Sequence, residues 1–211
     1  MLQATSDTPD RRTRILDAAE RCFVRQGFHL TTMQHIAAEA GMSAGNLYRY
    51  FPSKDSLVEG LCERDRREMA HAFEAFEGAE DFMAVFAQLG RHHFEDEPRE
   101  KAILCLQIWA EATRSPAVAG IVSALSDDVV ERLAAILERA RARGAIAPVL
   151  PPVRIARLIA TLADGLFVRR ALAPGFDAAA EIPPVLDLIG GLVSGRVAGD
   201  GCDCPNAEVV P

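Results

Sequence analysis

The sequence predicts an all-α protein, with a small helical unit at the N-terminus and a larger helical unit behind it. Apolar residues recur at helical spacing along most of the chain. No stretch alternates apolar and polar residues as a half-buried strand does, and no internal repeat is found. Apolar residues make up 49% of the 211, which allows a sizeable core and argues against global disorder.

Three short helices are expected in the first unit. The first of them ends at Gly27 and carries an apolar stripe made of Ile15, Ala19, Cys22 and Phe23. Hydroxyl side chains accept hydrogen bonds from the unpaired N–H groups of a first helical turn. Thr32 is placed to cap MQHIAAEA, Ser43 to cap AGNLYRYF before Pro52, and Ser53 to cap a longer helix.

About six longer helices follow, the first beginning after Ser53. The others are expected at residues 80–95, 99–114, 117–143, 153–173 and 182–197. A Gly/Pro-rich linker, RGAIAPVLPP, precedes the last two. The predicted division of the chain is a disordered arm at 1–10, a small domain at 11–53, a helical domain at 54–197 and a disordered tail at 198–211.

Charge is distributed unevenly along the chain. The net charge is −7, but residues 1–54 sum to +2 and the remainder to −9, so a local patch can still bind phosphate. No apolar run approaches the roughly 18 residues of a membrane span, and residues 1–10 lack a leader pattern. Five cysteines without framework spacing (Cys22, Cys62, Cys105, Cys202 and Cys204) fit a reducing cytoplasm. We therefore expect a cytoplasmic protein without a membrane partner.

Residues 33–52, MQHIAAEAGMSAGNLYRYFP, form a helix-turn-helix pattern. The inward-facing positions are Ile36, Ala37, Ala40, Met42, Leu47 and Tyr50. Gly41 lies where the chain has to turn sharply, which suits its permissive backbone. The second helix would enter a DNA major groove with its small N-terminal residues nearest the base edges. Tyr48 and Arg49 lie farther along its exposed side, and Lys54 lies in the first turn of the next helix.

Residues 11–64 resemble the N-terminal DNA-binding domain of the TetR family of bacterial transcriptional regulators. The matching residues are RILDAAERCFVRQGFHLTTMQHIAAEAGMSAGNLYRYFPSKDSLVEGL, in which the caps, the IA…AG turn and the LYRYF helix occur in register. The resemblance implies a homodimer that binds a palindromic double-stranded DNA operator, usually as a repressor. It also implies a C-terminal domain that senses a small-molecule effector, and it leaves repressor and activator both open.

The resemblance also implies roles for individual residues. Tyr48 and Lys54 would contact phosphate, with Thr32 adding a contact through the start of its helix. Tyr50 would either contact phosphate or pack inward. The full predicted DNA-binding set is Thr32, Gln34, Ser43, Ala44, Gly45, Asn46, Tyr48, Arg49, Tyr50 and Lys54.

The effector pocket is predicted from aromatic and apolar bulk in the second domain. The expected lining residues are Phe86, His93, Ile108, Trp109 and Phe167. His93, Gln107 and Glu111 are candidate polar anchors, although a structural role is favoured for each of them. Trp109 is open to a second interpretation as a core anchor. No cationic cluster marks the pocket, so an apolar or cationic ligand is favoured.

The last two predicted helices carry more apolar residues than one buried face needs. We expect two such hairpins to pack as a four-helix dimer interface. The predicted interface residues are Leu158, Leu162, Leu166, Ile189 and Leu192.

Two short patterns of histidine, acidic and cysteine residues could bind a metal, and each also has a simpler interpretation. His92 with Asp96, and His93 with Glu97, could chelate a metal, but solvated helix-end residues or one pocket-lining histidine are favoured. The CDC motif at 202–204 is interpreted as inert, and no metal or cofactor is expected. A small-molecule binder with a vestigial DNA-binding head is the main alternative. An enzyme is disfavoured because no nucleophile–base pair or phosphate-binding glycine loop is present.

Overall fold

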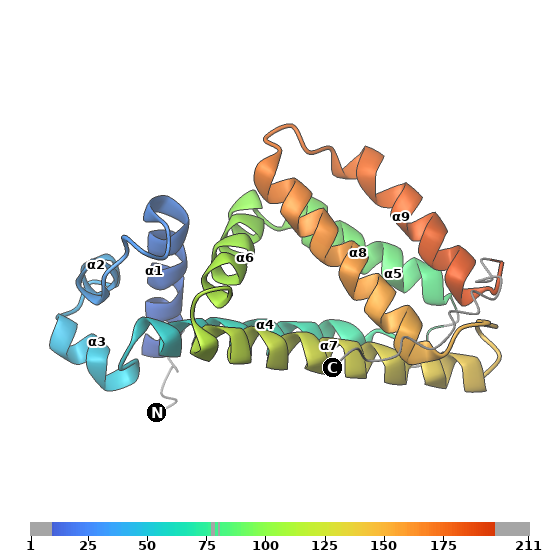
Figure 1. Cartoon of the computed structure of the whole chain (residues 1–211), viewed down its shortest axis with the longest axis horizontal. Coiled ribbons are helices and arrows are strands. Elements are labelled where there is room, and N and C mark those ends of the chain that lie inside the picture. Colours follow the sequence, from blue (N-terminus) through green and yellow to red (C-terminus); the bar gives the residue numbers. More distant parts are fainter. Residues whose placement is uncertain (1–9, 77–78, 80, 197–211) are drawn as a thin grey trace, which may run out of the picture.

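Figure 1 shows the computed structural model of the chain, in which residues 10–76, 79 and 81–196 are described. Every regular element within these ranges is helical, which confirms the all-α prediction. No helix in them is both long and apolar enough to cross a bilayer. The predicted arm, apart from Asp10, and the predicted tail with Cys202 and Cys204 lie outside the described residues.

The head of the molecule consists of three helices at the left of Figure 1. They are α1 (Arg11–Gln26), α2 (Met33–Glu39) and α3 (Ala44–Tyr50). The three predicted caps are confirmed. The hydroxyl of Thr32 accepts from the His35 N–H at 3.2 Å, and the hydroxyl of Ser43 accepts from the Asn46 N–H at 3.3 Å. The hydroxyl of Ser53 caps α4 in the same way.

The described part of the body contains six longer helices and one π-helical turn. They are α4 (Lys54–Glu74), α5 (Phe82–Arg91), η1 (His92–Asp96), α6 (Arg99–Ala112), α7 (Pro116–Ala142), α8 (Pro152–Leu172) and α9 (Ala178–Val193). In Figure 1, α4 and α7 run side by side along the base, and α6 stands next to the head. Helix α8 packs on α6 and α7, and α9 pairs with α5.

Two boundaries differ from the sequence prediction. The helix expected at 80–95 is α-helical only to Arg91 and continues as the π turn η1. The last helix begins at Ala178 instead of 182, because the Asp177 carboxylate accepts from the Ala179 N–H at 3.0 Å and caps an earlier turn. It ends at Val193 instead of 197, two residues before Gly195, whose φ is +71°.

Buried apolar residues form two large clusters. One joins the head to α4, α6 and α7, and it includes Leu104, Ile108 and Val118 from the body. The other lies inside the body, between α4, α5, α7, α8 and α9. The head therefore shares a core with α6. The second cluster forms a separate core inside the body.

Candidate nucleic-acid interface and apolar cavity

Helix α3 is fixed by one fully buried side chain and presents its other side to solvent. Leu47 is 0% exposed, and Tyr50 is half-buried against the same cluster. Tyr48 is 49% exposed and Arg49 is also exposed. The inward interpretation of Tyr50 therefore matches its position, and the outer side of α3 offers a phenol and a guanidinium.

The turn before α3 is held by main-chain geometry and by α1. Gly41 has φ +67°, in the region that favours glycine. The Arg14 guanidinium donates to the Ala40 carbonyl at 3.0 Å. The guanidinium groups of Arg21 and Arg25 donate to Glu39 at 2.8 and 3.0 Å, and they hold the pKa of that carboxyl below its usual value. These contacts hold the end of α2 against α1, directly before the turn that leads to α3.

The two threonines before α2 have different positions. Thr32 is exposed and caps the helix, as predicted. Thr31 is buried, and its hydroxyl contacts the carbonyls of Cys22 and Gly27 at 3.1 and 2.8 Å. No role for Thr31 was predicted from the sequence, where the adjacent Thr31-Thr32 pair is its signal. The structure shows that Thr31 anchors the start of α2 to the end of α1.

Lys54 is not a free surface charge. Its ammonium donates to the Phe28 carbonyl at 2.7 Å and lies 4.4 Å from the centre of the Phe28 ring. Burial lowers the pKa of this lysine. An ammonium has three donors, so this contact leaves others for a phosphate. The structure thus positions Lys54 at the start of α4 by a contact that the sequence did not reveal.

The predicted DNA-binding residues are gathered on α2, α3 and the first turn of α4, or immediately before these helices. The exposed members are Thr32, Gln34, Ser43, Gly45, Tyr48 and Arg49, and the partly buried members are Ala44, Asn46, Tyr50 and Lys54. This surface combines hydroxyl, amide, phenol and cationic groups on one end of the molecule (Figure 1). Such groups bind phosphates and base edges of duplex DNA.

A cavity of about 130 Å³ lies inside the body. Its walls come from α4, α5, η1, α7, α8 and α9, and they include four phenylalanines: Phe73, Phe86, Phe94 and Phe167. His93 is the one lining side chain that carries a nitrogen or oxygen atom. Of the five predicted pocket residues, Phe86, His93 and Phe167 line this cavity.

The other two predicted pocket residues lie elsewhere. Ile108 belongs to the cluster that joins α6 to the head, so its prediction as a lining residue is corrected. Trp109 does not line the cavity but adjoins it, with its ring centre 6.5 Å from that of Phe167 in an edge-to-face arrangement. Glu111 is buried next to Arg114 and His29, at 3.1 and 3.6 Å, and it connects α6 to the head.

Three predicted dimer residues also need correction. Leu166 and Ile189 line the cavity, and Leu192 is buried in the body cluster, because α8 and α9 turn these side chains toward α5 and α7. Leu158 is 43% exposed and Leu162 is partly exposed. The sequence showed that both helices are apolar on more than one side, but it did not show which side faces inward.

His93 is the polar group of the cavity wall. Its Nδ1 lies 3.3 Å from Glu97 Oε1. Its Nε2 is buried and has no hydrogen-bond partner in the described part of the chain. A neutral imidazole that donates from Nδ1 to Glu97 keeps Nε2 as an acceptor. The cavity can therefore hold an apolar molecule, and His93 Nε2 in its wall is a buried acceptor that no described residue uses.

Comparisons with known proteins agree with this architecture. A model described as "Bacterial regulatory proteins, tetR family" matches residues 15–61, and one described as "BetI-type transcriptional repressor, C-terminal" matches residues 83–192. The HTH-type transcriptional regulator UidR of Escherichia coli K12 is 31% identical over 158 residues, which cover 74% of this chain and 79% of UidR. The HTH-type transcriptional regulator BetI of Agrobacterium fabrum is 28% identical over 183 residues, 85% of each chain.

Two solved structures of other proteins superpose on most of this chain. Salmonella enterica GusR superposes with a TM-score of 0.77 at 26% identity, covering 90% of this chain and 98% of GusR. Thermus thermophilus FadR, a transcriptional repressor solved in complex with lauroyl-CoA, superposes with a TM-score of 0.61 at 25% identity, with the same coverage.

Proposed function

The chain belongs to the TetR family of bacterial transcriptional regulators, and from that premise we propose that it is a repressor which binds a palindromic operator as a homodimer and leaves it when a small apolar molecule fills the cavity. The observation that carries the DNA-binding part is the outer side of α3. Leu47 is locked in the core of the head while Tyr48 and Arg49 face solvent.

The DNA-facing residues divide by the chemistry they offer. Lys54 and Tyr48 carry a point charge and a phenol, which suit phosphate oxygens and do not read bases. Arg49 carries a planar fork of donors, which suits the two acceptors of a guanine edge in the major groove. We therefore assign positioning on the DNA to Lys54 and Tyr48, and base recognition to Arg49.

Two single substitutions separate these roles. Lys54→Ala should weaken binding to operator and random duplexes equally and should reduce the salt slope by about one unit per half-site. Arg49→Ala should cost about 1–3 kcal/mol on the operator and little on random DNA. Fluorescence anisotropy against salt, with an operator found by in vitro selection, measures both.

A charge-matched control is Arg141→Ala, which removes a cation paired with Glu138 at the far end of α7. It should leave both affinities unchanged. The assignment of Arg49 is wrong if Arg49→Ala lowers the affinity for operator and random DNA in parallel.

The effector part of the proposal rests on the cavity. Its volume of about 130 Å³ is close to that of an engineered apolar cavity of about 150 Å³ that binds benzene. None of the lining residues carries a carboxylate, which favours an apolar molecule over a cationic one. His93 Nε2 favours a molecule with one hydroxyl or N–H donor. The related Thermus thermophilus FadR was solved in complex with lauroyl-CoA, whose acyl chain is apolar, and this supports an apolar group in the cavity.

Benzyl alcohol is a suitable probe, and toluene is its control without the hydroxyl. Benzyl alcohol should change the fluorescence of Trp109, which contacts the cavity wall through Phe167, and should release operator over the same concentration range. One range is required because a ligand shifts DNA binding only through its different affinities for the two states. Toluene should bind more weakly, and His93→Leu should remove the difference between the two probes. Operator release by benzyl alcohol with an unchanged Trp109 signal would contradict the assignment of the cavity.

A further inference from the structure

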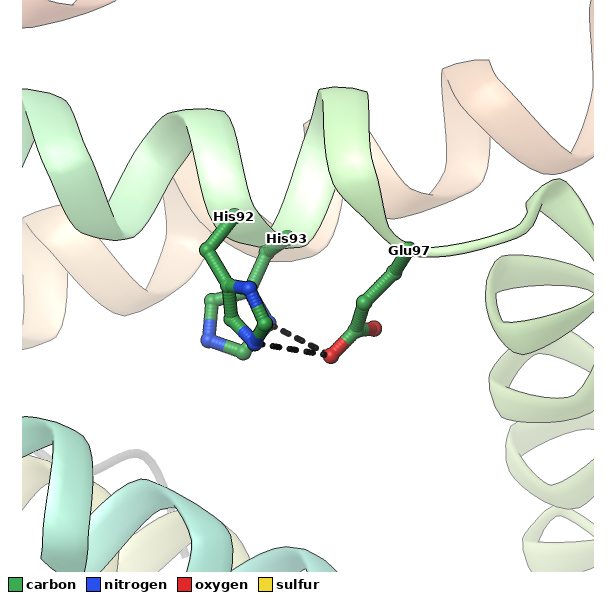
Figure 2. Close-up of side chains that lie close together, drawn as sticks. All are labelled: His92, His93 and Glu97. Carbon is green, nitrogen blue, oxygen red and sulfur yellow. Dashed lines mark ion pairs between the residues drawn. The ribbon is translucent and has the colours of Figure 1, made fainter.

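The π turn η1 places three metal-ligand side chains together. In an α-helix His92 would face Asp96, and His93 would face Glu97. Here the Glu97 N–H donates to the His92 carbonyl at 3.0 Å, which closes an i→i+5 turn and brings His92 round to Glu97. Figure 2 shows both imidazoles directed at one carboxylate oxygen, Glu97 Oε1. The distances are 3.6 Å from His92 Nε2 and 3.3 Å from His93 Nδ1.

We propose that His92, His93 and Glu97 form a binding site for a divalent transition-metal ion such as Zn²⁺. Two histidines and one glutamate are a recurring set of zinc ligands, in sites that leave one position open. With metal–ligand bonds of about 2.0–2.1 Å, ligand atoms at the corners of a tetrahedron lie about 3.4 Å apart. The two measured nitrogen–oxygen distances are close to this value, and the three ligand atoms all lie within 4.8 Å of one another.

The surroundings of the three ligands support this assignment. Asp96 Oδ2 lies 3.9 Å from His92 Nδ1, so its negative charge is on the side of the ring opposite to the Nε2 that faces Glu97. Glu97 Oε2 is buried without a hydrogen-bond partner among the described residues, so a chelating carboxylate would use an atom that is otherwise unpaired. The buried Arg170 donates to the carbonyls of His93 and Glu97 and holds the turn from α8.

Two cations and two exposed acids also bear on the site. Arg170 and Lys101 lie close to Glu97 and oppose a second positive charge there. Asp96 and Glu95 are exposed acids on the same turn and act in the opposite direction. His92 is 57% exposed, so the open coordination position can face solvent. We therefore expect a reversible site instead of a closed structural one.

The site shares an imidazole with the cavity. A metal on His93 Nδ1 leaves the ring proton on Nε2, which then donates instead of accepting. Metal binding at η1 would thus change the chemical group that the cavity prefers. This consequence depends on the proposed effector site, whereas the metal site itself does not.

Calorimetric titration of the full chain with Zn²⁺, after chelator treatment, tests the proposal. We expect about one ion per chain. His92→Ala removes an exposed ligand and should weaken Zn²⁺ binding at least about 100-fold. The loss of a residue that only supports a ligand typically costs roughly 10–100-fold in metal affinity. The matched control is His71→Ala, since His71 pairs with Glu74 at 3.1 Å on the surface of α4 but has no third ligand among the described residues. It should bind Zn²⁺ like the parent chain.

Cysteines are the competing zinc ligands. Burial raises the pKa of Cys62 to about 11 and that of Cys105 to about 12, so these thiols are poor ligands at neutral pH. A chain with Cys202→Ser and Cys204→Ser should keep the site. The proposal is overturned if the parent chain binds no Zn²⁺, if His92→Ala binds like the parent, or if the double serine variant loses binding. Glu97→Gln should also lose Zn²⁺ binding. If that variant does not fold, the titration of His92→Ala decides whether the site exists, because His92 is exposed and its loss leaves the core intact.

Discussion

At the scale of single residues, Gly60 sets how closely α4 approaches the head. A Cβ atom at this position would lie 2.8 Å from Phe51 Cε1 and 2.9 Å from Leu16 Cδ2. Both neighbours are buried, and Phe51 is 1% exposed, so its ring has little room to move. The glycine thus permits the contact through which the head and α4 share one core.

Gly60→Ala should therefore destabilise the protein by about 1–3 kcal/mol, because overpacking outweighs the gain in helix propensity. Gly120→Ala is the matched control, since Gly120 lies exposed within α7 and no side chain or neighbouring element lies within 4 Å of the added Cβ. It should stabilise by about 0.5–1 kcal/mol. Urea unfolding measures the change in the free energy of unfolding for each variant. Equal changes in the two variants would contradict the close approach at Gly60.

At the scale of helices and turns, the features that were predicted correctly are those that depend on residues close by in the sequence. The caps at Thr32, Ser43 and Ser53 depend on atoms three residues away, and all three are present. The turn at Gly41 follows from one backbone conformation, and it too is present. The helix types and their order in the head were therefore accessible from sequence alone.

The π turn was not accessible, because its supports lie far along the chain. The guanidinium that binds the carbonyls of His93 and Glu97 belongs to Arg170, more than 70 residues away. Because an α-helix places residues four apart on one face, the sequence predicts that His92 meets Asp96 and does not predict its contact with Glu97. The predicted chelating pairs were consequently only part of the arrangement that the fold produces.

The inward side of α8 and α9 was equally inaccessible. Leu158 and Leu166 have the same side chain on the same helix, yet one is 43% exposed and the other lines the cavity. Helical periodicity identifies apolar faces but does not say which neighbour covers each face. The same reason explains Ile108, whose partner is the head and not the cavity.

At the scale of the whole molecule, α6 lies between the DNA-binding head and the cavity. Ile108 belongs to the cluster shared with the head, and the next residue, Trp109, contacts Phe167 in the cavity wall. Glu111, two residues further along, faces His29 of the head. A molecule that displaces Phe167 would therefore act on a helix that is already packed against the head, and coupling needs such a physical connection.

The exposed apolar surface of the body is concentrated on α8 and α9. Four of the seven exposed large apolar or aromatic side chains in the described chain lie there: Val153, Leu158, Leu172 and Leu188. Burying such side chains against a second copy is the simplest way to remove them from water. This set replaces the buried Leu166, Ile189 and Leu192 in the proposed dimer interface.

We predict that Leu158→Glu with Leu188→Glu converts the proposed homodimer to a folded monomer. Both side chains are 43% exposed in the single chain, so glutamate is solvated in the monomer, whereas an unpaired carboxylate in an interface costs several kcal/mol. Leu30→Glu, at a 73% exposed site on the head, is the control and should remain dimeric. Ile189→Glu should instead unfold the chain, because its carboxylate would enter the core beside the cavity. Sedimentation velocity at micromolar concentration, with circular dichroism to confirm folding, distinguishes these outcomes. A dimeric double variant, or a monomeric parent chain, would reject the α8–α9 interface.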